Sequence, residues 1–229
     1  VKGFSVVCLW LLSIGTLWCS MVQASTLDDY LEKRQQVMLL PYADIIPALK
    51  RTEFDTTTPL GRYFYYSVWL NAGQGESAIT PSPADWQALQ TRYPVLFHES
   101  RILKTWFSGE PAQTKLQNLY QLKQIAATHN WVRLRRLASY YLVMTYQGEG
   151  SYLNAIIELY NVMKIAPSAT AAYDWYDFPL TEMYKSMAYS MFGLENDAER
   201  LKYCTKLTEL TETSSHLSSD FLANALSCQ

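Results

Sequence analysis

The chain has 229 residues, of which 49% are apolar and 14% aromatic, and its formal net charge is −2 at pH 7. This apolar content excludes a disordered chain and is enough for one core or a short repeat array. The balance of 19 basic and 21 acidic side chains offers no strongly basic face, so nucleic acid is not an expected partner.

The first element is an apolar leader. Residues 1–24 start with a single Lys, run apolar from Phe4 to Val22 and end in Val22-Gln23-Ala24. This ending fits signal peptidase, so we expect a signal peptide cleaved before Ser25 and a periplasmic protein. The apolar run could also span a bilayer, which leaves an uncleaved membrane anchor as the alternative.

Helical periodicity follows nearly everywhere after the leader. Breakers containing Pro, Gly and Thr divide the chain into segments of helical length, and no segment shows sustained alternation of apolar and polar residues. The segment from Arg62 to Leu70 resembles a strand in composition, but it follows Pro59 and precedes Gly73, which favours a buried helix. The sequence therefore predicts an all-α fold.

Two segments of the C-terminal half share a pattern. Residues 141–155 and 184–198 align at a constant spacing of 43 residues. The identical positions are Tyr141/Tyr184, Met144/Met187, Tyr146/Tyr189, Gly150/Gly193 and Ala155/Ala198. Each glycine is expected to end a helix in the left-handed conformation, and the Tyr and Ala side chains to meet where two antiparallel helices cross. The pattern predicts helix–turn–helix units.

These units resemble the tetratricopeptide repeat. The positions that carry the resemblance are Leu142, Tyr146, Gly150, Tyr152, Ala155, Leu159 and Pro167. Ser139 and Val143 depart from the family pattern, and the second copy has Lys185 where the pattern has Leu. The spacing of 43 also exceeds the usual 34 or so. The resemblance implies a right-handed superhelix of antiparallel helix pairs, with divergent pairs in residues 25–110 and tetratricopeptide-like repeats in residues 111–229.

The same resemblance implies a binding surface. The first helix of each pair would line a concave face that receives a peptide, a protein partner or a small ligand. The lining positions are Tyr140, Met144, Gln147, Met183, Met187 and Ser190. Tyr and Met suit an adaptable apolar groove, but neighbouring helices could equally bury these side chains.

A second candidate site is a basic and aromatic patch. Trp131 lies beside Arg133 and Arg136, and the two arginines share one helix face. The patch could hold an anionic ligand such as a lipid headgroup or a nucleotide, or it could be a solvated helix face.

Catalysis has one candidate. Glu99-Ser100 resembles the catalytic Glu-Ser of lytic transglycosylases, in which a single carboxyl acts as acid and then as base. The alternative is an exposed helix carboxylate beside Arg101. Gly148 to Gly150 follows a helix, and Leu153 stands where a dinucleotide fingerprint has its third glycine, so no nucleotide cofactor is expected. The three histidines are scattered, and no metal site is expected either.

The remaining prediction is a disulfide. After cleavage the chain keeps only Cys204 and Cys228, and an even pair in an oxidising compartment is most simply bonded. Cys204 falls in a helix expected from about Glu195 to Glu212, so the bond would clamp the last helix. Two unbonded thiols, or two chains joined through Cys228, are the alternatives.

The sequence thus favours a periplasmic binding module. Its layout resembles the tetratricopeptide sensor regions that precede diguanylate cyclase or histidine kinase output domains, so it could be the sensor part of a signalling protein. A structural adaptor in cell-envelope assembly is the second hypothesis, and a cell-wall lyase using Glu99 is the third.

Overall fold

The computed structural model describes residues 27–73, 77, 79–165 and 180–214. All regular secondary structure in these ranges is helical, which confirms the predicted all-α class. The predicted leader, 1–24, lies outside the described residues. Contacts divide the chain into two compact units, Val1–Arg92 and Tyr93–Gln229. The sequence placed its boundary at residue 110 instead, between the helices α5 and α6 described below.

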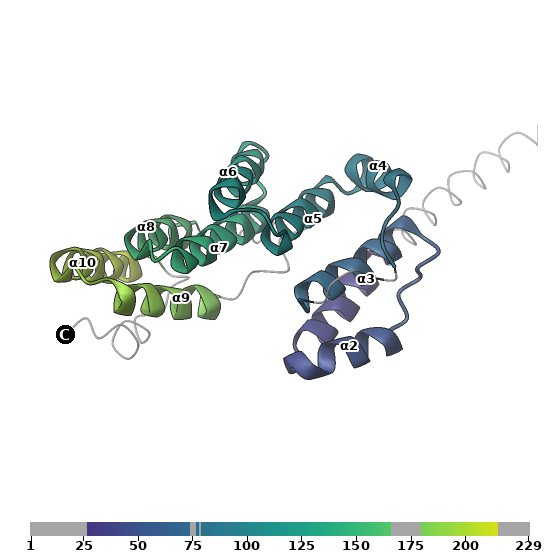
Figure 1. Ribbon diagram of the computed structural model, residues 1–229, viewed down its shortest axis with the longest axis horizontal. Helices are drawn as coiled ribbons and strands as arrows, with labels where there is room; N and C mark the ends of the chain where they lie inside the picture. The colour runs from purple at the N-terminus through teal and green to yellow at the C-terminus, as the bar shows by residue number, and fades with distance from the viewer. Residues whose placement is uncertain (1–26, 74–76, 78, 166–179, 215–229) are drawn as a thin grey trace, which may run out of the picture. The chain divides into compact units, whose positions relative to one another are not determined.

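The first unit is built from residues 27–38, which are helical, and three further helices. These are α2 (Tyr42–Arg51), α3 (Pro59–Asn71) and α4 (Pro83–Arg92) (Figure 1). The start of α3 follows from its sequence: Pro59 occupies the first turn, and the Thr58 side chain accepts a hydrogen bond from the Gly61 N–H. The predicted helix over Arg62–Leu70 is therefore confirmed.

Two contacts hold α3 in this unit. A Cβ at Gly61 would lie 1.9 Å from the Asp55 carbonyl oxygen, so only glycine fits the close approach of the two backbones. Arg62 forms a two-pronged ion pair with the buried Asp85 of α4, at 2.8 and 2.6 Å. Because the Ser82 N–H and hydroxyl also donate to Asp85, this carboxylate both starts α4 and joins it to α3.

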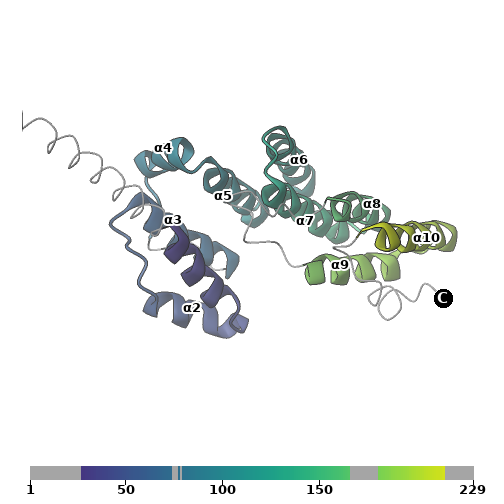
Figure 2. The same cartoon turned by 180° about the vertical axis from the view of Figure 1, so that it is seen from behind.

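The described part of the second unit contains six helices. They are α5 (Pro94–Phe107), α6 (Ala112–Thr128), α7 (Val132–Gly148), α8 (Tyr152–Met163), α9 (Leu180–Gly193) and α10 (Asp197–Thr213). α5 packs on α6 and α7, α7 packs on α8 and α9, and α8 packs on α9 and α10. Figures 1 and 2 show this succession from both sides. Each helix thus contacts only near neighbours in the chain, as in a helical repeat array.

Two turns of this unit have the same geometry. The turn after α7 has Gly150 at φ +68°, and the Ser151 N–H donates to the Tyr146 carbonyl. The turn after α6 has Asn130 at φ +55°, and the Trp131 N–H donates to the Ala126 carbonyl. Both residues are left-handed helix caps. The cap predicted at Gly150 is confirmed, and Asn130 is an equivalent cap that the sequence analysis did not single out.

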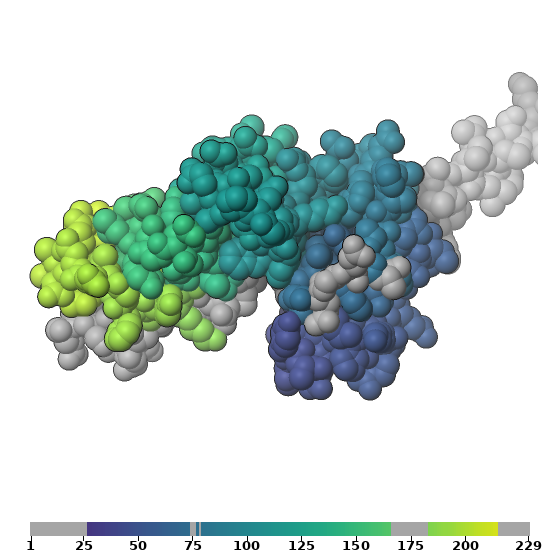
Figure 3. Space-filling view, in the orientation of Figure 1, coloured from purple at the N-terminus to yellow at the C-terminus, as the bar shows by residue number. Residues whose placement is uncertain are grey.

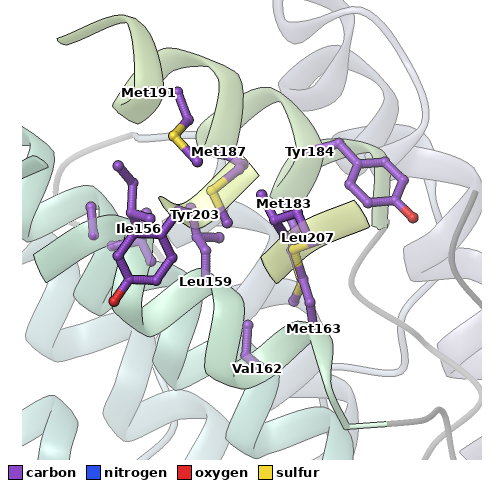
Figure 4. Close-up of a cluster of buried hydrophobic side chains, with 12 residues drawn as sticks. Ile156, Leu159, Val162, Met163, Met183, Tyr184, Met187, Met191, Tyr203 and Leu207 are labelled. Atoms are coloured by element: carbon purple, nitrogen blue, oxygen red, sulfur yellow. The ribbon is translucent and has the colours of Figure 1, made fainter. Parts of the chain in front are cut away.

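One core cluster of the second unit lies between α8, α9 and α10 (Figure 4). Met183, Met187 and Met191 of α9 pack against the aliphatic side chains of α8, including Ile156 and Leu159. Tyr203 and Leu207 of α10 complete this cluster. In the space-filling view, side chains fill the space between neighbouring helices from α6 to α10 (Figure 3).

Candidate functional site

The residues predicted to line the groove meet where α7 and α9 pack together. Gln147 Nε2 donates to the Ser186 carbonyl oxygen at 3.0 Å and to Ser190 Oγ at 2.8 Å. Met183, Met187 and Ser190 have no exposed surface, while Tyr140, Met144 and Gln147 are half-buried. Gln147 therefore joins α7 to α9 at a packed contact. The three residues of α9 are buried by neighbouring helices, whereas those of α7 keep part of their surface exposed.

The arginines of the predicted anionic patch point into the unit. Arg133 is 6% exposed, and its Nη2 lies 2.6 Å from Oε1 of Glu99 in α5. Arg136 is fully buried and donates to the Ile165 carbonyl oxygen beyond the end of α8. Arg133 thus joins α7 to α5, and Arg136 joins α7 to the chain just after α8. The two arginines therefore do not form the solvated helix face that was the alternative.

Glu99 belongs to the same buried network. It is 3% exposed and takes part in the ion pair that joins α5 to α7. The expected exposed carboxylate beside Arg101 is therefore replaced by a buried one. A polysaccharide could not reach this carboxyl without opening the contact between α5 and α7.

Trp131 lies between two histidines. Its ring centroid is 4.5 Å from that of His129, with nearly parallel planes, and 5.6 Å from that of His98 in α5. His98 Nδ1 is buried without a hydrogen-bond partner. Burial, the positive charge of Arg101 and His129 lower the pKa of His98, in that order. The histidines are far apart in sequence, so this stack could not be predicted from spacing.

An exposed set of aromatic side chains gathers at one end of α7 and α9. Phe192 is 90% exposed and Tyr189 is 57% exposed, although both lie in a helix that contributes three methionines to the core. Tyr152, the first residue of α8, packs its ring at 6.0 Å from that of Tyr189. We call the set Tyr120, Tyr146, Tyr152, Tyr189 and Phe192 the aromatic edge.

Hydrogen bonds connect the tyrosines of the aromatic edge in pairs. The hydroxyls of Tyr120 and Tyr146 lie 2.7 Å apart. The hydrogen bond to Tyr189 raises the pKa of Tyr152. Burial raises the pKa of Tyr120, and the bond to Tyr146 adds to this effect. The hydrogen bond from Gln147, the residue after Tyr146, to Ser190, the residue after Tyr189, links the helices that carry the two pairs.

Gly193 has a role at this edge that differs from the predicted one. A Cβ at this position would lie 2.7 Å from the Tyr152 ring, so glycine allows the ring to pack on the end of α9. The left-handed conformation is present at Gly150 and Gly73, whereas Gly193 is not among the residues of positive φ. The expected cap at Gly193 is corrected to a close packing contact. The spacing of Tyr189 and Phe192 on one face of α9 was the available signal for the edge, and repeat matching used only Tyr189.

The predicted disulfide involves one described residue. Cys204 is buried in α10, at 5% exposed, and the helix spans Asp197–Thr213 as expected within two residues. Cys228 lies outside the described residues, so the bond stays a prediction.

Other kinds of site find little support among the residues that the structure describes. No group of three or more His, Cys, Asp or Glu side chains there could hold a metal ion. None of the described helices is long and apolar enough to cross a membrane. Comparison of the chain with protein families, with curated proteins and with solved structures finds no match.

Proposed function

We propose that the chain is a tetratricopeptide-like module of the periplasm that binds a protein or peptide partner through the aromatic edge. The observation that carries this proposal is the exposure of Phe192 and Tyr189 on a helix that otherwise supplies core residues. Exposed aromatic side chains are enriched at the centres of protein interfaces, because their burial on binding releases much ordered water.

The tetratricopeptide part of the proposal is supported by the spacing of contacts. Glu99 pairs with Arg133, 34 residues later, and Lys123 pairs with Glu158, 35 residues later. The Trp106 ring stacks on that of Tyr141 at 5.0 Å. Since the contacts of α5 with α7 advance together along both helices, the two helices run parallel, as first helices of successive repeats do. This spacing is close to the roughly 34 residues of the family.

The helix pair α5–α6 then acts as a repeat before α7–α8, although its sequence lacks the family pattern. The lengths of chain between the helices also explain why the aligned segments are 43 residues apart. Only residues 129–131 separate α6 from α7, whereas residues 164–179 separate α8 from α9. The additional residues therefore lie in the chain between α8 and α9, in a stretch most of which is outside the described residues.

Partner binding through the aromatic edge would suit a sensor region and an adaptor of cell-envelope assembly alike, so the proposal includes both roles. An amphipathic or extended peptide with apolar side chains is the partner class that suits exposed Tyr and Phe rings. We do not propose the cell-wall lyase activity, because Glu99 is occupied by its ion pair with Arg133.

A capture experiment with matched variants tests this proposal. Full-length protein is immobilised and exposed to an envelope extract, in wild-type form and with Phe192→Gln and Tyr189→Gln combined. We expect the captured partners to be lost from the variant. Because both side chains are exposed, its free energy of unfolding should stay within about 0.5 kcal/mol of wild type.

The control for this experiment is Leu201→Gln in α10. Leu201 is 65% exposed, so its replacement also removes apolar surface, but it is not part of the aromatic edge. This variant should keep the partners. Equal capture by wild type and the double variant would contradict binding through the edge.

A further inference from the structure

Lysine and tyrosine side chains of α8 and α10 form a second cluster, separate from the aromatic edge. The rings of Tyr160 and Tyr203 meet edge to face with centroids 6.0 Å apart. Lys164 Nζ lies 4.1 Å from the centroid of the Tyr160 ring. Lys206 Nζ lies 5.6 Å from the same centroid and 4.9 Å from that of Tyr203. Both ammonium groups thus lie near the Tyr160 ring, and Lys206 also lies near that of Tyr203.

These two lysines differ from their neighbours in having no carboxylate partner in the part of the chain that the structure describes. Lys123 is paired with Glu158 at 2.6 Å, and Lys202, beside the Tyr203 ring, is paired with Glu199 at 3.0 Å. Among the described residues, no ion pair involves Lys164 or Lys206. The attraction between an ammonium group and a tyrosine ring contributes only about 0.5–1 kcal/mol at an exposed site. The tyrosine rings are thus the only partners that the described residues offer to these two ammonium groups.

The two lysines occupy different positions along their helices. Lys164 is the C-cap of α8, where a positive charge is favourable to the helix dipole. Lys206 lies in the middle of α10, so no helix end explains its charge. It nevertheless stays half-buried against the rings of Tyr160 and Tyr203.

We propose that Lys164 and Lys206 bind a phosphate group, from a free phosphate compound or from a lipid headgroup. The charges match, because a phosphate monoester carries about −1.5 to −2 at pH 7 and two ammonium groups supply +2. Lysine is a phosphate ligand with three donors on a compact charge. The rings of Tyr160 and Tyr203 support the two lysine side chains, and Figure 4 shows the Tyr203 hydroxyl directed away from the methionines of the core. This site does not depend on the proposed function.

Calorimetric titration and vesicle binding test this site and separate its two sources. The full chain is titrated with sodium phosphate at constant ionic strength, with sodium chloride as the blank. In parallel, it is sedimented with vesicles of phosphatidylcholine alone and with vesicles containing phosphatidylglycerol. We expect saturable binding in one arm, weakened at least about tenfold by Lys164→Gln combined with Lys206→Gln, because two charge-assisted contacts are lost.

The matched control removes the same amount of charge elsewhere. Lys50→Gln combined with Lys202→Gln neutralises one exposed lysine of the first unit and the lysine that is paired with Glu199. Binding of phosphate that only the first double variant loses identifies a soluble ligand, and binding of anionic vesicles that only it loses identifies a lipid headgroup. Equal weakening in both double variants, or no saturable binding in either arm, would overturn the proposal. Circular dichroism of each variant confirms that the helices are retained.

Discussion

The pairs α7–α8 and α9–α10 share a sequence pattern but pack differently. Ala155 is fully buried at the start of α8, whereas its counterpart Ala198 is exposed at the start of α10. Tyr146 is half-buried, whereas its counterpart Tyr189 is 57% exposed. α7 and α8 form an extensive antiparallel contact, whereas α10 packs on α8 and reaches α9 through Tyr203 and Leu207.

This difference teaches that a repeated pattern does not ensure a repeated environment. Helices pack on both sides of α7–α8, and Ala155 is fully buried there. Among the described residues, no helix follows α10, and Tyr189 and Phe192 of α9 remain exposed. The following predictions test how far the two pairs differ, from the largest expected effect to the smallest.

The aligned methionines Met144 and Met187 should differ most. Met187→Glu places a charge in the fully buried core of α8, α9 and α10, and we expect a loss of at least roughly 2–5 kcal/mol of stability, the range for truncating a buried Met. Met144→Glu should cost much less, since Met144 is half-buried. Urea unfolding measures both. Equal losses would show that the two positions are equivalent after all.

The polar contacts between successive first helices should also differ in strength. Arg133→Met leaves the buried Glu99 carboxylate without its ion-pair partner, and we expect a loss of roughly 3–5 kcal/mol. Gln147→Leu removes a neutral hydrogen bond to Ser190, for which about 1 kcal/mol is expected. Denaturant unfolding gives both values.

A double variant provides the control for the ion pair. Combining Arg133→Met with Glu99→Leu removes both charges, so much of the lost stability should return. If the double variant is as unstable as Arg133→Met alone, the loss comes from packing rather than from an unpaired charge.

The aligned glycines should respond differently to alanine. Gly150→Ala forces a side chain into the left-handed conformation, at a cost of roughly 1–2 kcal/mol. Gly193→Ala should change stability less, because alanine favours the helix while its Cβ displaces the Tyr152 ring. The displaced ring loses its bond to Tyr189, so the raised pKa of Tyr152 should fall toward 10.0. NMR titration of the tyrosines measures this shift, and an unchanged Tyr152 would refute the packing role of Gly193.

The smallest effect should be a pH dependence confined to α5–α7. The folded state lowers the pKa of His98 from its ordinary value of 6.5, so its contribution to stability is fully present above pH 6.5 and is lost as the pH falls below it. His98→Gln should remove this part of the pH dependence. Unfolding of both proteins between pH 7.5 and about 5 gives the difference. α9 and α10 contain no histidine, so a variant such as Tyr189→Gln should retain the wild-type profile.

Local sequence determined the helices and most of their ends. Pro59 with Thr58 begins α3, Gly150 ends the segment of α7, and the predicted helix around Cys204 is α10 within two residues. These features depend on backbone conformation and on neighbouring side chains, which a short stretch of sequence contains. The repeat pattern likewise indicated that α7 pairs with α8, whereas α9 and α10 both pack on α8.

Only the tertiary structure decided the partners and exposure of the polar and aromatic side chains. Arg133 could be a ligand or a solvated residue by sequence, and it is the position of Glu99 on a parallel helix that buries it. Met187 and Phe192 are both apolar residues of α9, but one is buried and the other exposed because α8 and α10 cover only one face of the helix. Contacts between residues of different helices, 34 positions apart for Glu99 and Arg133, set these environments, and helical periodicity contains no information about them.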